Sequence, residues 1–127
     1  IERSELVRLT QIDYAREMAF VATAPDALGV ERTLGVVRAV ADPDNVEAEF
    51  GIIVRSEMKG EGLGELLIKQ IIDYLRRHGT QRLVATVLNE NTRMLQLARD
   101  LGFREEAHKH EPGTRWVELD LAVPERP

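Results

Sequence analysis

The chain contains no cysteine. This absence excludes disulfides, zinc–thiolate sites, iron–sulfur clusters and a cysteine nucleophile together. It also fits a reducing compartment, and we therefore expect the protein to be cytoplasmic. We expect no metal site, because His108 and His110 have the spacing of a ligand pair but no third ligand accompanies them.

Long hydrophobic runs and an excess of positive charge are also missing. No apolar run approaches the roughly 18 residues that a membrane-spanning helix needs, so the sequence predicts no membrane span. Lysine and arginine number 17 against 22 aspartate and glutamate residues, a net charge of −5. Nucleic acid is therefore not an expected partner, because binding its phosphate backbone requires a basic surface.

The 127 residues suffice for one domain, and 43% of them are hydrophobic, enough for an ordinary core. The chain begins with Ile1, and no signal-peptide pattern follows. We therefore expect residues 1–127 to be a single domain cut from a longer, multidomain protein.

Hydrophobic periodicity predicts helices and strands along the whole chain. The predicted helices are 4–11, 65–78 and 91–101, and the predicted strands are 18–23, 31–41, 46–54, 82–88, 103–108 and 115–121. Three successive strands joined by short turns indicate an antiparallel meander. The whole order predicts an α/β domain with a mixed sheet and helices on it.

A glycine-rich loop joins the predicted strand 46–54 to the predicted helix 65–78. Gly60, Gly62 and Gly64 would expose backbone N–H groups at the start of that helix, where the helix dipole favours an anion such as phosphate. Lys59 could pair with a phosphate oxygen. The alternative is a tight turn whose glycines serve packing alone. The spacing matches neither the P-loop, which needs Gly-Lys-Ser/Thr, nor the Rossmann fingerprint.

A third pattern does fit. Residues 59–64 (KGEGLG) match Arg/Gln-x-x-Gly-x-Gly with lysine in the first place, and Asn91 opens a helix that ends at Gly102-Phe103. Both motifs, in this order, resemble the GNAT superfamily of N-acetyltransferases. The resemblance implies a mostly antiparallel sheet flanked by helices, a splay between two parallel central strands, and acetyl-CoA as cosubstrate.

A narrower resemblance lies in residues 9–14, 35–38 and 48–50, which are similar to bacterial Pat-type protein lysine acetyltransferases. It implies a protein substrate with an acceptor lysine, of the acyl-CoA synthetase type. It also implies a fused regulatory domain outside this chain. The broader GNAT resemblance implies that the first strand of the fold lies before Ile1.

The resemblance implies the residues that bind acetyl-CoA. Asn91 would cap its helix and touch CoA. The backbone of Ile52, Ile53 and Val54 would pair with the pantetheine arm. The pyrophosphate would lie on the N–H groups of the loop, which are those of Lys59, Gly60, Glu61, Gly62, Leu63 and Gly64.

Glu49 is the expected general base, ten residues before Lys59. An acceptor lysine has a pKa near 10.4 and arrives protonated, so a buried carboxylate must take its proton, directly or through a water. Glu47 is a competitor, because it points to the same face of the strand. A solvated pair of glutamates without a catalytic role is the third possibility. Ala98 stands where many members of the superfamily carry a tyrosine that protonates the leaving thiolate.

These expectations converge on direct transfer of acetyl from acetyl-CoA to a lysine side chain of a protein. A small-molecule amine or a protein N-terminal amine is the alternative acceptor. A CoA-binding regulatory module without catalysis is the alternative of another class, and a placed carboxylate at Glu49 argues against it.

Overall fold

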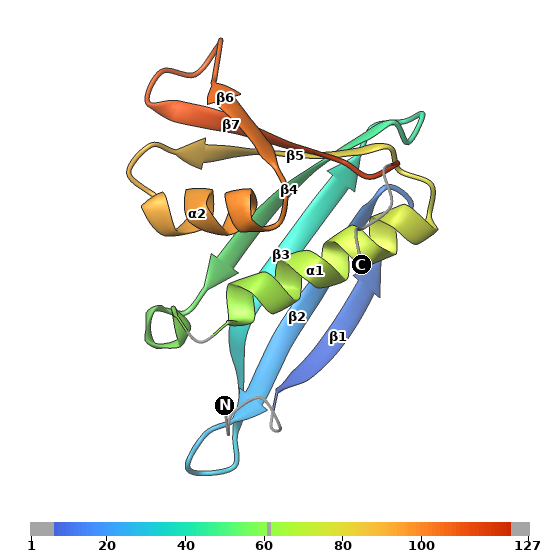
Figure 1. Ribbon diagram of the computed structural model, residues 1–127. Coiled ribbons are helices and arrows are strands. Elements are labelled where there is room, and N and C mark those ends of the chain that lie inside the picture. Colours follow the sequence, from blue (N-terminus) through green and yellow to red (C-terminus); the bar gives the residue numbers. More distant parts are fainter. Residues whose placement is uncertain (1–6, 61, 123–127) are drawn as a thin grey trace.

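The computed structural model describes residues 7–60 and 62–122. One sheet contains seven strands in the order β1-β2-β3-β4-β5-β7-β6 (Figure 1). The strands are β1 (Arg8–Asp13), β2 (Glu17–Pro25), β3 (Glu31–Ala41), β4 (Glu47–Val54), β5 (Arg82–Leu88), β6 (Arg104–Ala107) and β7 (Thr114–Asp120). The helices are α1 (Leu63–Arg77) and α2 (Thr92–Asp100), and Ser56–Met58 forms a short 3-10 turn before α1.

Neighbouring strands run antiparallel except β4 and β5, which are parallel. The parallel pair arises because α1 is the crossover between them, whereas short turns connect the meander β2-β3-β4. The predicted mixed sheet, its meander and its two central parallel strands are therefore confirmed.

Helix α1 packs against β2, β3 and β4. Its apolar stripe includes Leu67 and Ile71, both fully buried, and the facing strands contribute Phe20, Val37 and Phe50. The positions between these on β3 and β4 point to the opposite face, where Arg38, Val40, Glu49, Gly51 and Ile53 are exposed. The sheet thus has one face under α1 and an open face on its central strands.

The helix predicted over residues 4–11 is wrong for the part that the structure describes, and residues 4–6 lie outside it. Residues 8–13 form β1, an edge strand that pairs with β2 from Arg8↔Thr23 to Asp13↔Met18. All six residues are exposed. Residues 8–13 therefore bury no apolar face that would stabilise a helix, whereas the edge of β2 offers backbone hydrogen-bond partners that stabilise a strand.

Within the described ranges, neither helix has the length and apolar character to cross a membrane.

Candidate functional site

The parallel strands β4 and β5 separate halfway along their length. Their pairing covers Glu47↔Arg82, Ala48↔Leu83 and Glu49↔Val84. Both strands continue beyond this point, β4 to Val54 and β5 to Leu88. Figure 1 shows the two arrows spreading apart, with α2 beside the opening. The outer half of β4 therefore faces a gap in the sheet instead of a neighbouring strand.

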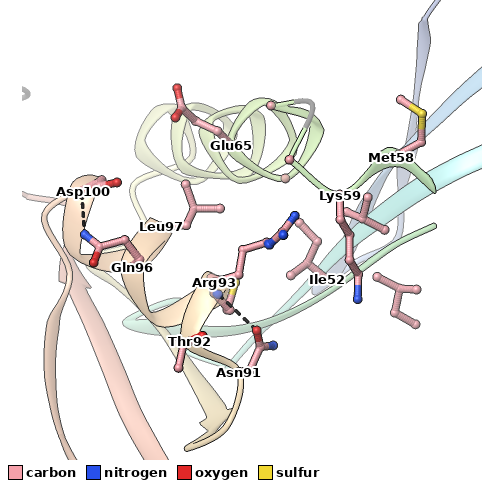
Figure 2. A pocket seen from close by; sticks show the side chains of 16 residues that line it. Ile52, Met58, Lys59, Glu65, Asn91, Thr92, Arg93, Gln96, Leu97 and Asp100 are labelled. Atoms are coloured by element: carbon pink, nitrogen blue, oxygen red, sulfur yellow. Dashed lines mark hydrogen bonds between the residues drawn. The ribbon is translucent and has the colours of Figure 1, made fainter. Parts of the chain in front are cut away.

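A cavity of about 1090 Å³ lies at this opening. It is bounded by the end of β4, the glycine-rich loop with the start of α1, and the exposed side of α2 (Figure 2). The residues that line it are Ile52, Ile53, Val54, Met58, Lys59, Gly60, Gly62, Gly64, Glu65, Asn91, Thr92, Arg93, Met94, Gln96, Leu97 and Asp100. The cavity is large enough for an elongated, multi-group ligand.

The glycine-rich loop is shaped to present backbone to this cavity. Gly60 and Gly62 have φ of 84° and 83°, a left-handed conformation that glycine adopts without steric cost. Gly62 is the N-cap of α1 and has no side-chain cap, and the first helical bond runs from Leu66 N–H to its carbonyl. The N–H groups that precede Leu66 in the first turn have no acceptor within the helix. They suit a phosphate group, so the loop fits the cosubstrate that the sequence predicts.

The structure brings eight of the ten predicted CoA-binding residues together around one cavity. Ile52, Ile53, Val54, Lys59, Gly60, Gly62, Gly64 and Asn91 all line the cavity. Leu63 opens α1, and its side chain is buried in the core. Glu61 lies outside the described residues. The loop, the end of β4 and the start of α2 thus form one continuous surface.

Asn91 is the N-cap of α2, as the sequence predicts. Its side-chain Oδ1 accepts a hydrogen bond of 3.1 Å from the backbone N–H of Met94. This bond satisfies one of the free donors of the first turn. Figure 2 shows the Asn91 amide at the wall of the cavity, close to the side chain of Arg93.

Glu49 lies elsewhere. It is the last residue of β4 that pairs with β5, it is exposed, and it is not among the residues lining the cavity. The expected burial of this carboxylate is wrong, because its side chain points to the open face of the sheet. Glu47, two residues earlier on the same face, lies 3.5 Å from the guanidinium of Arg82. Glu49 thus has the freer carboxylate, at the base of the opening.

Sequence reasoning missed the contribution of α2 beyond Asn91. Thr92, Arg93, Met94, Gln96, Leu97 and Asp100 line the cavity. The predicted N-cap at Asn91 could have indicated this contribution. A ligand that contacts the N-cap of a helix also comes close to the residues of the first helical turn.

Neither tyrosine lies at the cavity. Ala98 is buried in the core, and Tyr14 and Tyr74 both line a smaller cavity of about 280 Å³ between β2, β3 and α1. Burial raises the pKa of the Tyr74 hydroxyl, and Asp13 raises it further. A tyrosine hydroxyl is therefore not available to the groups around Glu49 and the glycine-rich loop.

In the described part of the chain, no three histidine or acidic side chains are grouped so as to hold a metal ion.

Known proteins share this fold. A solved GNAT domain of Streptomyces lividans PAT superimposes with a TM-score of 0.71 at 24% identity, covering 87% of this chain and 64% of that one. A cAMP-binding acyltransferase from Mycobacterium smegmatis superimposes with a TM-score of 0.68 at 28% identity, covering 87% of this chain and 32% of that one.

Curated relatives are acetyl- and acyltransferases. An L-amino acid N-acyltransferase of Escherichia coli is 34% identical over 74 residues, which are 56% of this chain and 43% of that protein. The chain spans about half the length of the curated relatives that it matches. The model of the acetyltransferase (GNAT) family matches residues 2–103, most of the chain. The family model, the fold and the glycine-rich loop agree, and the chain belongs to the acetyltransferase (GNAT) family.

Proposed function

We propose that the chain transfers acetyl from acetyl-CoA directly to a lysine side chain of a protein substrate. In this proposal the pyrophosphate lies on the N–H groups of the glycine-rich loop, and the pantetheine arm follows the backbone of Ile52, Ile53 and Val54. The thioester then reaches the opening between β4 and β5. Glu49 is the last residue of β4 that pairs with β5, and it lies about 10 Å along the strand from Ile52, the first residue of β4 that lines the cavity.

The chemistry assigns one proton-transfer step to Glu49. Its carboxylate takes a proton from the lysine ammonium, directly or through a water, so that the amine nitrogen carries a free electron pair. The nitrogen attacks the thioester carbonyl, the carbon–nitrogen bond forms, and the carbon–sulfur bond breaks. Between these two events, backbone N–H groups at the opening stabilise the negative charge on the former carbonyl oxygen of the tetrahedral intermediate. The nitrogen loses a second proton as the amide forms. CoA leaves as a thiolate, and this second proton reaches the thiolate through water, so that free CoA carries a thiol.

The open face around Glu49 is the observation that carries the choice of a protein acceptor. Glu49, Gly51 and Ile53 are exposed, and Ile53 is 77% exposed. A lysine on a protein surface can approach such a face, whereas a small amine needs an enclosing pocket for tight binding. The narrower sequence resemblance supports the same acceptor and suggests acyl-CoA synthetases as targets.

A small-molecule amine is the second candidate acceptor. The observation that favours it is the similarity to an L-amino acid N-acyltransferase of Escherichia coli. In that case residues outside this chain would enclose the substrate over the face of Glu49, because this relative is more than twice as long as the matched segment.

We also propose that this catalytic domain works beside a regulatory module in the cytoplasm. The cAMP-binding acyltransferase of Mycobacterium smegmatis supports this arrangement, since the chain covers only 32% of that protein. A chain of this kind responds to a signal that the fused module binds.

Acceptor competition tests the proposal. The chain is incubated with acetyl-CoA and either an acyl-CoA synthetase or a panel of free amino acids and polyamines, and CoA release and acetyl-lysine are measured by thiol assay and mass spectrometry. Acetylation of specific lysines of the synthetase, with no release for the small amines, is the expected result. Release with a small amine alone would replace the protein acceptor by the second candidate.

A further inference from the structure

Arg93 reaches from α2 to the glycine-rich loop. It is the second residue of α2, and it lines the same cavity as Lys59. A Cβ atom placed on Gly60 would lie 3.3 Å from Nη1 of Arg93. Figure 2 shows the Arg93 side chain extended inside the cavity, between the start of α2 and the loop. Its guanidinium therefore lies at the backbone of the loop, although it belongs to a different helix.

The guanidinium of Arg93 has no partner among the residues that the structure describes. By contrast, Arg99, on the same helix, forms an ion pair with Glu105. An extended, unpaired arginine against a glycine backbone is available to a ligand anion. Its planar fork can donate two parallel hydrogen bonds to phosphate oxygens.

The charges along the cavity show where an anion would bind. Lys59 and Arg93 lie at the end next to the loop. Asp100 lies at the other end of α2, about 10 Å further along the helix axis, where it accepts a hydrogen bond of 2.9 Å from Gln96. Glu65 also lines the cavity and is paired with Lys69 at 3.0 Å. Phosphate is therefore attracted to the Lys59–Arg93 end and repelled from the Asp100 end.

We propose that Arg93 binds the pyrophosphate of acetyl-CoA from the side opposite the glycine-rich loop. Its guanidinium then holds the pyrophosphate against the N–H groups of the loop. The inference rests on the proposed use of acetyl-CoA and adds a residue and a direction of binding to it. The pyrophosphate is the phosphate concerned, because the guanidinium lies at Gly60 itself. Two elements, α1 and α2, then fix the cosubstrate from opposite sides.

Calorimetric titration of acetyl-CoA into the wild-type chain and into Arg93→Gln tests this role. The glutamine variant is expected to raise Kd about tenfold to a hundredfold, because one charge-assisted contact to phosphate is lost. Arg93→Lys should lie between the two, because it keeps the charge without the fork. Lys109→Gln is the matched control: it removes the same charge from an exposed residue that does not line the cavity, and its Kd should equal that of wild type.

Truncated ligands identify the phosphate. With 3′-dephospho-acetyl-CoA, which keeps the pyrophosphate, Arg93→Gln should cause the same fold-loss as with acetyl-CoA. With S-acetyl-pantetheine, which has no phosphate, wild type and variant should bind equally weakly in an NMR titration. The thermal midpoint of Arg93→Gln should match wild type, since the side chain has no protein partner to lose.

Two outcomes would overturn the inference while leaving the acetyl-CoA site in place. Equal Kd values for wild type and Arg93→Gln would show that the guanidinium contacts no part of the cosubstrate. A loss that disappears with 3′-dephospho-acetyl-CoA would assign Arg93 to the 3′-phosphate instead. Failure of the wild-type chain itself to bind acetyl-CoA would refute the proposed function, which is a different result from either.

Discussion

Glu49 and Val84 are the last residues at which the two parallel strands of the sheet pair. Beyond them β4 and β5 separate, and the cavity that the glycine-rich loop borders begins at the outer half of β4. Glu49, the candidate general base, therefore lies where the opening between the two strands begins, on the open face of the sheet. This relationship joins the two halves of the proposed reaction: cosubstrate enters from the loop, and the acceptor approaches from the face of Glu49.

Replacing the carboxylate of Glu49 should separate catalysis from binding. Glu49→Gln is expected to lower kcat about a hundredfold or more at neutral pH, because the amine loses its proton acceptor. The Kd of acetyl-CoA should not change, since Glu49 does not line the cavity. Glu47→Gln is the control, because it changes the same charge on the same face and should keep most of the turnover. Equal losses in kcat and in affinity would make Glu49 a structural residue.

A side chain at Gly62 should interfere with the phosphate. Gly62→Ala puts a methyl group on the N-cap of α1, where no protein atom lies within 4 Å and where the ligand would approach. Gly29→Ala is the matched control, because Gly29 has a similar φ of 79° and equally open surroundings.

Both substitutions are expected to lower the free energy of unfolding by about 1 kcal/mol, because a residue with a Cβ atom is strained in the left-handed conformation. Only Gly62→Ala should raise the Kd of acetyl-CoA, by about tenfold or more, because a methyl group displaces the phosphate from the N–H groups. Urea unfolding and calorimetry separate the two effects. Unchanged affinity would remove the loop from the proposed binding site.

Close packing of α1 on the sheet should make Gly35 intolerant of any side chain. A Cβ atom there would lie 3.1 Å from the carbonyl oxygen of Ile53 and 3.1 Å from Cδ1 of Leu67. Gly35→Ala should therefore destabilise the fold by about 1–3 kcal/mol, because one of the two neighbours must shift. Gly51→Ala, on the open face of the adjacent strand, meets no atom within 4 Å and should be neutral or slightly stabilising. Equal midpoints in urea for the two variants would contradict this account of the helix–sheet contact.

Glu105 should make stability depend on pH. It receives hydrogen bonds from Arg99, on α2, and from Arg115, on β7, the latter at 2.8 Å. The bond from Arg99, followed by that from Arg115, holds the pKa of the Glu105 carboxyl below its ordinary value of 4.5. A carboxyl whose pKa is lower in the folded chain stabilises the fold above its unfolded pKa, and this stabilisation is lost as the pH falls through the folded pKa.

Glu105→Gln should therefore cost about 1 kcal/mol near pH 7, since both arginines are partly exposed. The difference from wild type should shrink as the pH falls below 4.5. Glu106→Gln is the control, because Glu106 is exposed and its contact with Arg104 is 3.5 Å long. A difference between wild type and Glu105→Gln that stays constant down to pH 3 would mean that the charge of Glu105 does not matter. Urea titrations at several pH values provide the measurement.

The strongly periodic segments were predictable from the sequence. The strand Arg82–Leu88 has the predicted bounds. Helix α1 begins within two residues of its predicted start, because its apolar residues have regular helical spacing and a glycine-rich loop precedes it. The capping of α2 by Asn91 was equally predictable, since a cap is a contact within four residues of the chain. The edge strand β1 was not, because only the exposed edge of β2 selects an extended conformation for residues 8–13.

The sequence by itself determined the local features of the site: a strand, glycines with left-handed backbone, and a helix N-terminus that favours an anion. Each depends on a few consecutive residues and on backbone sterics. Only the tertiary structure decided that Glu49 is exposed instead of buried, that β4 and β5 separate just beyond it, and that Arg93 of α2 meets Gly60 of the loop. Those outcomes depend on how α1 and α2 pack on one twisted sheet, which brings residues more than 30 positions apart into contact.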